Sequence, residues 1–414
     1  MTLTTNIAEP IFAGPPEPDL TPAEVIARAH RIAATLVDRQ AETERRTFYA
    51  EDTHEAFRDA GFYRILVPHR FGGHDFGIDT FMRVVQILTR ACPSTGWMYC
   101  LGAAHAHVVG TLFEERVQEE AFAGGEFIAP ATVMPSGEAV RTEGGWLLTG
   151  TWSYCSGIPY ASHFVGHTLV SRAEGEPPEP MMFIVDSSQW TRLDDWGGQL
   201  GLKGSGSHSI VMENAFVADY QTIATHMSQV NVTEGTPGRR LHTNPEYGGG
   251  PLSFMVLEDA VLAVGMAQGA LDAYGDLMRS RTTMFPPIVG RAENEDFQFW
   301  YGEATGMIAT AEAAFHQSIQ TWRELCEQGP EAFTVEQELR IAVICREVVR
   351  LCWDAVQKYL FPTAGSSAVR QGQRIERVWR DLSMQHSHAG ISIFLTTIAK
   401  RELTKLEFGV VDEH

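Results

Sequence analysis

The stretch WGGQLGLKGSGSHSIVMENAFV, residues 196–217, decides which class of fold the chain can have. It opens with a loop rich in glycine and serine, and a β-type run follows at 209–217. The amides of such a loop can approach a phosphate or a flat ring. In a dinucleotide-binding fold, however, the glycine loop leads from a strand into a helix. Because a strand follows here, the sequence excludes that fold, and a tight hairpin loop is the simpler interpretation of this stretch alone.

Short β-type runs continue on the N-terminal side of this loop, and helical patterns lie beyond them on both sides. The β-type runs span 127–220 and are separated by Gly, Pro, Asp and Asn, which favours a compact antiparallel sandwich or barrel. Before them, apolar residues recur every three or four positions from Thr21, where Thr21, Pro22 and Glu24 form a helix-start signal. After them, long segments with broad apolar faces indicate a helix bundle.

The sequence therefore predicts an α+β chain that is mostly α-helical. The expected parts are a flexible N-terminal arm at 1–20, an N-terminal helical domain at 21–125, a central β domain at 126–227, a linker at 228–251, and a C-terminal four-helix bundle at 252–414.

Composition and charge narrow the possible functions of the chain. Its 414 residues are 44% hydrophobic and 20% charged, as in an ordinary globular protein. The net charge of −20 argues against binding to nucleic acid or to an anionic membrane. We find no signal peptide and no long apolar run, so we expect a cytoplasmic protein. The six cysteines form no C-x-x-C pair and the 15 histidines no H-E-x-x-H motif, so we expect no catalytic metal.

Three further segments contain residue types that could carry chemistry. GTWSYCSG, residues 150–157, predicts a strand that ends at a turn, where the Ser156 hydroxyl could bond a flat heterocycle. For this segment taken alone, an ordinary Ser–Gly turn is the simpler interpretation. Residues 94–110 place His105 and His107 on a small-residue helix, and residues 365–394 contain a basic helix with His386 and His388. For these histidines a structural, hydrogen-bonded role is the simpler interpretation.

The order of four segments resembles the acyl-CoA dehydrogenase superfamily over nearly the whole chain. These segments are LVPHRFGG at 66–73, GTWSYCSG at 150–157, GLKGSGSHSIVMENAFV at 201–217, and ERVWRDLSMQHSHAG at 376–390. The resemblance implies a helical–β–helical subunit, a flavin between the β domain and the C-terminal helices, and a homotetramer.

One position departs from the dehydrogenases of this superfamily. Many of them carry a glutamate, the base that removes the substrate α-proton, eight residues after the aspartate of an Arg-Asp pair. Counting from Asp381, that position is Ala389, which cannot accept a proton. Some dehydrogenases place the base on another helix, so an acyl-CoA dehydrogenase or oxidase stays an alternative.

A different branch of the fold is more similar, namely the two-component flavin monooxygenases that act on phenol, hydroxyphenylacetate and steroid phenols. The marks of that branch are Ser94 to Trp97 with His105, Trp152 to Gly157, Asp381 with His388, and SSAV at 366–369. The resemblance implies an oxygenase component that receives reduced flavin, FMNH2 or FADH2, from a separate NAD(P)H-dependent flavin reductase. With O2 it would form a C4a-hydroperoxide and hydroxylate a small, aromatic or phenolic substrate.

The resemblance also assigns roles to individual residues. Ser156 would bond flavin N5, and His388 and His105 would assist proton transfer, for which imidazole is suited. His107 and His386 are the alternates for these two histidines. The remaining cofactor-binding candidates are Tyr154, Gly157, Gly204, Ser205, Gly206, Ser207, Ser366, Ser367 and, from a neighbouring subunit, Arg281. The candidates for substrate contact are Trp97, Tyr99 and His386.

Other functions on the same fold stay open at this point. Related branches oxidise the amino group of nucleotide-linked sugars or the sulfur of heterocycles, and the second of these also carries two histidines in the last helices. A member without catalytic activity, acting as a scaffold or binding protein, is the alternative from a different class.

Overall fold

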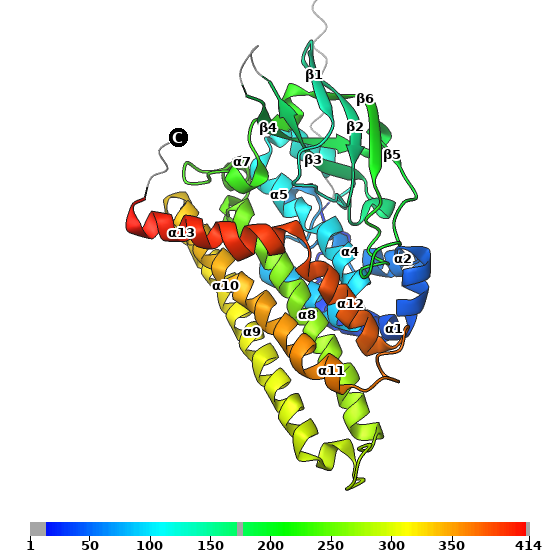
Figure 1. Cartoon of the computed structure of the whole chain (residues 1–414). Helices are drawn as coiled ribbons and strands as arrows, with labels where there is room; N and C mark the ends of the chain where they lie inside the picture. The colour runs from blue at the N-terminus through cyan, green and yellow to red at the C-terminus, as the bar shows by residue number, and fades with distance from the viewer. Residues whose placement is uncertain (1–13, 172–176, 411–414) are drawn as a thin grey trace, which may run out of the picture.

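The computed structural model of the chain describes residues 14–171 and 177–410. Much of the predicted N-terminal arm therefore lies outside the described residues. The chain forms a helical layer, a sheet and a second set of helices in sequence order, which confirms the predicted fold class. Figure 1 shows the sheet at one end of the molecule and the long C-terminal helices running away from it.

The N-terminal helices begin where the sequence signals predicted. The Thr21 hydroxyl accepts a hydrogen bond from the N–H of Glu24 at 3.2 Å, and Pro22 occupies the first helical position. The helices of this part are α1 (Pro22–Arg46), α2 (Glu51–Asp59), α3 (Ile78–Ala91), α4 (Pro93–Ala103), α5 (His105–Leu112) and α6 (Glu115–Ala121).

The described strands form one seven-stranded sheet in the order β5-β6-β2-β1-β3-β4-β7. The strands are β1 (Glu138–Thr142), β2 (Gly145–Trp152), β3 (His163–Val170), β4 (Glu179–Asp186), β5 (Thr191–Arg192), β6 (Ile210–Ala218) and β7 (Thr222–Ile223). The sheet is antiparallel except between β1 and β3, which run in the same direction because β2 separates them in the chain. One face buries an apolar cluster that includes Leu148, Trp152, Phe164 and Phe183.

The C-terminal helices are α8 (Pro251–Ser280), α9 (Glu295–Gln328), α10 (Val335–Asp354), α11 (Phe361–Thr363), α12 (Arg374–His386) and α13 (Ala399–Phe408), with α7 (Pro237–Leu241) before the bundle. Of these, α9, α10 and α12 pack against α8, and α13 packs against α10. Two π-helical segments, Ala355–Leu360 and Gly390–Ile398, follow α10 and α12.

Helix α8 is the apolar centre of this bundle. By length and composition it is the one described helix that could cross a membrane, but 83% of its most apolar window is buried inside the protein. A core helix has this composition because it packs against neighbours on every side. Burial of α8 against α3, α9, α10 and α12 accounts for its apolar sequence.

Candidate active site

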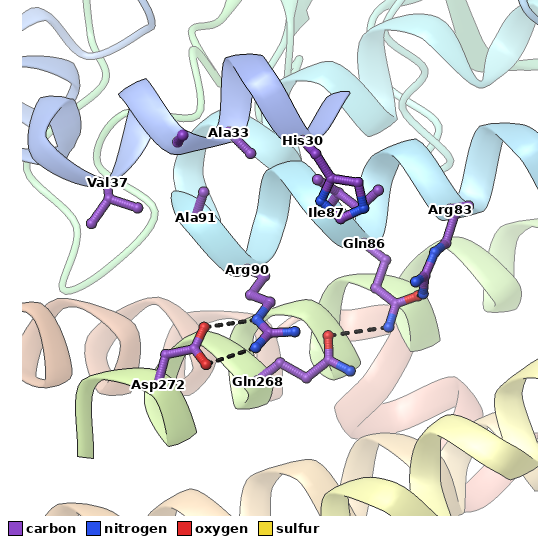
Figure 2. Close-up of a pocket in the computed structure, with 11 residues that line it drawn as sticks. His30, Ala33, Val37, Arg83, Gln86, Ile87, Arg90, Ala91, Gln268 and Asp272 are labelled. Carbon is purple, nitrogen blue, oxygen red and sulfur yellow. Dashed lines mark hydrogen bonds and ion pairs between the residues drawn. The ribbon is translucent and has the colours of Figure 1, made fainter. Parts of the chain in front are cut away.

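A cavity of about 250 Å³ lies between α1, α3 and α8, away from every predicted site residue. Figure 2 shows that Arg90 pairs with Asp272 and that Gln86 donates to Gln268, at 2.7 and 3.1 Å. Because these polar groups satisfy one another, we assign the cavity no role in the chemistry.

The structure brings together side chains from three distant segments at the junction of sheet and helices. The indole N–H of Trp97 donates to the Ser156 hydroxyl at 3.0 Å. The Ser156 and Ser207 hydroxyls lie 2.7 Å apart, as do those of Ser207 and Ser205. The Ser205 hydroxyl donates to the carbonyl of Leu202 at 2.7 Å. We call these four side chains, Trp97, Ser156, Ser205 and Ser207, the serine relay.

Two glycines allow the serine relay to lie against α4. Gly157 has φ of +98° and Gly206 has φ of +59°, a region that favours glycine. A β-carbon at Gly157 would lie 3.0 Å from Cα of Gly102 and 3.1 Å from the carbonyl oxygen of Met98. Tyr154 also has positive φ, and its exposed ring meets Trp196 edge-on instead of joining the relay.

Helix α12 is fastened directly to the loop that carries Ser205 and Ser207. The Asp381 carboxylate accepts the N–H of Leu202 at 2.5 Å, and Arg380 donates to the carbonyl of Leu200 at 2.9 Å. Burial raises the pKa of Asp381 to about 7, although the N–H of Leu202 acts in the opposite direction. Closer to the relay, the N–H of Gly204 donates to the Ser94 hydroxyl at 3.2 Å.

The two histidines of the α12 region point in different directions. The imidazole of His388 is exposed and meets the indole of Trp97 edge-on, with ring centroids 6.1 Å apart. His386 instead stacks on Trp353 at 4.9 Å, and its buried Nδ1 has no partner among the described residues. The structure therefore places His388, and not His386, beside the serine relay.

His105 and His107 are both buried on α5. The Nδ1 of His105 lies 2.7 Å from the carbonyl oxygen of Ala129, and burial lowers the pKa of this imidazole to about 4. A neutral ring that donates from Nδ1 keeps its lone pair on Nε2. His107 packs against Phe254 with ring centroids 4.7 Å apart, and burial lowers its pKa to about 3. His107 therefore belongs to the hydrophobic core.

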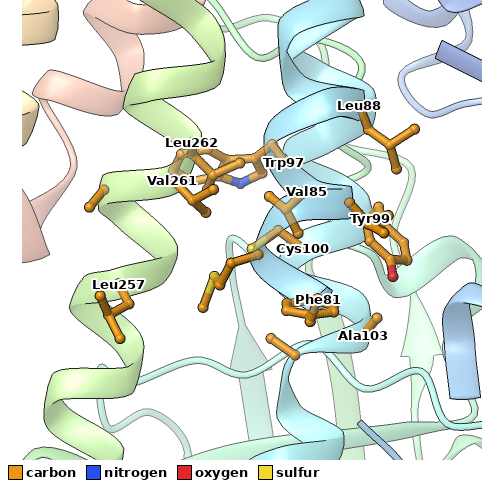
Figure 3. Close-up of a cluster of buried hydrophobic side chains, with 14 of the residues drawn as sticks. Phe81, Val85, Leu88, Trp97, Tyr99, Cys100, Ala103, Leu257, Val261 and Leu262 are labelled. Atoms are coloured by element: carbon orange, nitrogen blue, oxygen red, sulfur yellow. The ribbon is translucent and has the colours of Figure 1, made fainter. Parts of the chain in front are cut away.

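Tyr99 does not lie where a substrate contact was expected. In Figure 3 Trp97 points toward α8, whereas Tyr99 points to the other side of α4. The Tyr99 hydroxyl donates to the carbonyl of Phe62 at 3.0 Å, and its ring lies among Phe57 and Phe81. Residues two apart on a helix face nearly opposite sides, so Tyr99 is a core residue of the N-terminal helices.

Arg281, Ser366 and Ser367 form a second group, separate from the serine relay. Arg281 follows the C-terminal end of α8 and donates to the hydroxyl of Ser367 at 2.6 Å. Both serines are exposed. Figure 1 shows this end of α8 at the opposite end of the molecule from the sheet.

Two acidic residues that the sequence reasoning missed face this region from α8. Glu258 is buried, and its Oε1 has no hydrogen-bond partner among the described residues. Burial raises its pKa well above the ordinary glutamate value, and Asp259 adds to the effect. Burial likewise raises the pKa of Asp259 to about 6, against the opposing influence of His388. Two adjacent acids in the apolar run FMVLEDAVLAVG, residues 254–265, were the signal that could have revealed them.

The described part of the chain contains no cluster of metal-binding side chains. Across residues 14–171 and 177–410 we find no group of three His, Cys, Asp or Glu side chains placed to hold a metal ion. All six cysteines are buried and unpaired, and burial raises the pKa of the Cys155 and Cys100 thiols.

Comparison with known proteins identifies relatives of similar length. The acyl-CoA dehydrogenase N-terminal domain matches residues 23–116, and the acyl-CoA dehydrogenase C-terminal domain matches residues 258–393. A pigment production hydroxylase from Rhodococcus sp. (strain ATCC 21145) is 28% identical over 381 residues, which cover 91% of this chain and 94% of the relative.

A second relative and a solved structure agree with these matches. The oxygenase subunit HsaA of a flavin-dependent monooxygenase from Rhodococcus jostii (strain RHA1) is 27% identical, over 87% of this chain and 93% of the relative. The structure of XiaF from Streptomyces sp. in complex with FADH2 and glycerol superposes with a TM-score of 0.83 at 22% identity, covering 94% of this chain and 96% of that one. This last likeness concerns the fold.

Proposed function

This chain belongs to the acyl-CoA dehydrogenase superfamily, and we propose that it is the oxygenase component of a two-component flavin monooxygenase. It binds reduced flavin from a separate NAD(P)H-dependent reductase, uses O2, and hydroxylates a small aromatic or phenolic substrate. The relatives support this proposal, because the oxygenase subunit of a flavin-dependent monooxygenase matches this chain over most of its length.

The hydrogen-bond direction in the serine relay is the observation that carries the proposal. Trp97 can only donate, and Ser205 donates its one hydroxyl hydrogen to Leu202. The hydrogen in the Ser205–Ser207 bond must then come from Ser207, and the hydrogen in the Ser207–Ser156 bond from Ser156. Every hydroxyl hydrogen is therefore used, and Ser156 keeps one lone pair that can only accept.

A site that can only accept suits reduced flavin. Reduced flavin carries an N–H at N5, whereas N5 of oxidised flavin is itself an acceptor and needs a donor. The relay therefore fits the reduced form of the cofactor, with Ser156 as the accepting residue. When bound, reduced flavin supplies the electrons that activate O2. The complex of a structural neighbour with FADH2 agrees with this fit.

The chain's own residues then have distinct tasks. Trp97 connects two of them, because its N–H holds Ser156 while its ring faces His388. His388 is exposed toward the site and can move a proton at a ring nitrogen. His105 is held in one tautomer by the carbonyl of Ala129 and offers its Nε2 lone pair.

The second group requires a neighbouring subunit in this proposal. Arg281 follows the end of α8 that lies farthest from the sheet and is bonded to Ser367, whereas the relay lies at the junction of sheet and helices, so one subunit does not bring the two groups together. We therefore include in the proposal a cytoplasmic homotetramer in which Arg281 reaches the flavin phosphate of a neighbour. Ser366 and Ser367 would contribute to the same phosphate site.

One observation favours a second candidate function, an acyl-CoA dehydrogenase or oxidase. Ala389 cannot act as a base, but the buried Glu258 and the half-buried Asp259 offer carboxyl groups on another helix. Such an enzyme would be purified with flavin and would be bleached by an acyl-CoA without any reductase.

The test is an anaerobic stopped-flow experiment. The protein is mixed with chemically reduced FMN or FAD, and oxygenated buffer is then added while the near-ultraviolet absorbance is followed. We expect a long-lived species that absorbs below the oxidised-flavin bands, which would also choose between the two flavins. In Ser156→Ala this species should decay faster and release more H2O2, whereas Ser153→Ala, from the same turn, serves as the matched control.

Two outcomes contradict the proposal. Reoxidation at the rate of free flavin with no intermediate, together with bleaching by an acyl-CoA, selects the dehydrogenase. No binding of flavin in either redox state selects a scaffold or binding protein without catalysis.

A further inference from the structure

His388 shares a small gap with a carboxylate on a different helix. Gly390 lines this gap, since a β-carbon there would lie 3.2 Å from Nδ1 of His388 and 3.7 Å from Oδ2 of Asp259. The Cε1 atom of the same imidazole would lie 3.4 Å from that β-carbon. The Nδ1 edge of His388 and the carboxylate of Asp259 therefore face each other across Gly390.

The contact between α8 and α12 fixes this arrangement. The side-chain amide of Gln385 donates to the main-chain carbonyl of Asp259 at 2.7 Å, and Gln385 is fully buried. This bond fixes the position of α12 along α8. Gln385 lies three residues before His388. The backbone thus holds the carboxylate and the imidazole in register.

The carboxylate of Asp259 has no structural task that explains it. Asp259 is half-buried, and among the described residues only burial and the charge of His388 act on its carboxyl group, with no hydrogen-bond donor. The neighbouring Glu258 is buried, and its Oε1 has no partner among the same residues. Burying the Oε1 of Glu258 without a donor costs free energy, and the partial burial of Asp259 costs free energy as well, so the presence of this acid pair requires another reason. Since two acids side by side do not both ionise readily, the pair carries one charge, which falls on the residue nearer to His388.

We propose that Asp259 is a positioning residue for His388, which it holds in the tautomer with the proton on Nδ1 and the lone pair on Nε2. A negative charge near one ring nitrogen favours the proton on that nitrogen. Glu258 stays neutral behind it and confines the charge to Asp259. The inference rests on the proposed function only in that His388 is the residue that moves a proton.

Nitrogen-15 NMR of histidine-labelled, flavin-free protein at pH 8 tests this assignment. The His388 signals are identified by their loss in His388→Gln. We expect the wild type to show the Nδ1–H tautomer at His388, and Asp259→Asn to shift it toward the Nε2–H tautomer that an unrestrained imidazole prefers. Asp272→Asn, the same substitution further along α8, should leave the signals unchanged.

Gly390→Ala provides a second route that leaves both side chains in place. Gly390 belongs to a helical segment, so the backbone accepts alanine, but the new methyl group would enter the gap and push His388 away from Asp259. We expect the same change of tautomer as in Asp259→Asn. This variant decides the question if Asp259→Asn does not fold.

The results separate the inference from the proposed function. An unchanged His388 tautomer in Asp259→Asn, or in Gly390→Ala where the first does not fold, overturns the positioning role whatever the enzyme's activity. A changed tautomer supports it, even if stopped-flow measurements with reduced flavin and O2 show no oxygenase chemistry and the proposed function fails.

Discussion

Two buried carboxyl groups lie at different heights along α8, and they differ in their hydrogen bonding. In its first turn, the Glu338 carboxyl of α10 accepts the N–H of Ser253 at 2.8 Å and its hydroxyl at 3.0 Å. One turn further on, Glu258 is just as buried, with 3% of its surface exposed in both cases, yet its Oε1 accepts nothing from the described residues.

The difference separates an acid that builds the fold from acids that serve a site. Glu338 satisfies donors at a helix N-terminus that would otherwise be unpaired inside the protein. The Oε1 of Glu258 accepts nothing from the described residues, and the half-buried Asp259 faces His388 across Gly390. Burial alone therefore does not separate these acids from Glu338, whereas the lack of a donor does.

Among these acids and their partners, removal of the imidazole that faces Asp259 should have the largest effect. We expect His388→Ala to lower the hydroxylation rate by about 100-fold or more, since a general acid–base group contributes at least that much. Flavin-stimulated O2 consumption and the melting temperature should stay close to wild type. The measurement is product formed per O2 consumed, with His386→Ala as the matched variant. A larger loss in His386→Ala would reverse the assignment of the two histidines.

Removing Glu338 of α10, which accepts hydrogen bonds from Ser253 in the first turn of α8, should affect stability instead of chemistry. We expect Glu338→Ala to lower the free energy of unfolding by about 2–3 kcal/mol, because Ser253 loses its acceptor and a cavity remains. Denaturant unfolding measures this change. Glu336→Ala, which removes a surface ion pair with Arg340 on the same helix, should cost less than about 0.5 kcal/mol. Equal effects in both variants would show that the buried hydrogen bonds contribute little.

The pH dependence of stability sharpens the role of Glu338. Burial raises the pKa of its carboxyl to about 7, so the folded state holds this proton more tightly than the unfolded chain. Stability contributed by the group is complete below its ordinary pKa and is lost as pH rises through the folded pKa. We expect the unfolding free energy to decline by about 2–3 kcal/mol between pH 4.5 and 7. The decline should be smaller in Glu338→Gln. Melting curves measured for both proteins across this pH range test the prediction, and an equal decline in both would contradict it.

Replacing an acid in the middle of α8 gives the smallest expected change. Glu258→Leu removes a buried carboxyl group whose Oε1 has no partner among the described residues and keeps a similar volume, so stability should stay the same or rise by up to about 1 kcal/mol. Glu338→Leu should instead destabilise the protein. If Glu258→Leu proved as harmful as Glu338→Leu, Glu258 would belong with the acids that build the fold.

Much of the fold was predictable from local patterns, but the partners of individual side chains were not. Apolar spacing and the signal at Thr21 predicted helices, and the glycine–serine loop before a strand excluded a dinucleotide fold. Trp97 and Tyr99 looked alike in sequence, although the helical rotation between them sends only Trp97 toward α8. The sequence also indicated Ser156, Ser205 and Ser207, but not their order of hydrogen bonding, which depends on packing between the sheet and α4.

The acids of α8 show why the rest could not be predicted. The position of Glu258 and Asp259 inside an apolar run could have revealed that this part of α8 is buried, but not whether the carboxyl groups find donors. Whether Glu258 finds a donor depends on α4 and α12, which come from opposite ends of the chain. The absence of a partner is a property of the assembled molecule and has no local sequence signal.

The attachment of residues 200–202 to Arg380 and Asp381 has a consequence for protein engineering. Hydrogen bonds from α12 to the carbonyl of Leu200 and from the N–H of Leu202 to α12 connect the loop to this helix. Gly201 lies so close to the α12 backbone that no side chain fits there. We therefore expect that this loop cannot be exchanged between related enzymes without α12. A functional chimera has to exchange α12 together with the loop, and the exchanged segment then includes His388, which follows α12 directly.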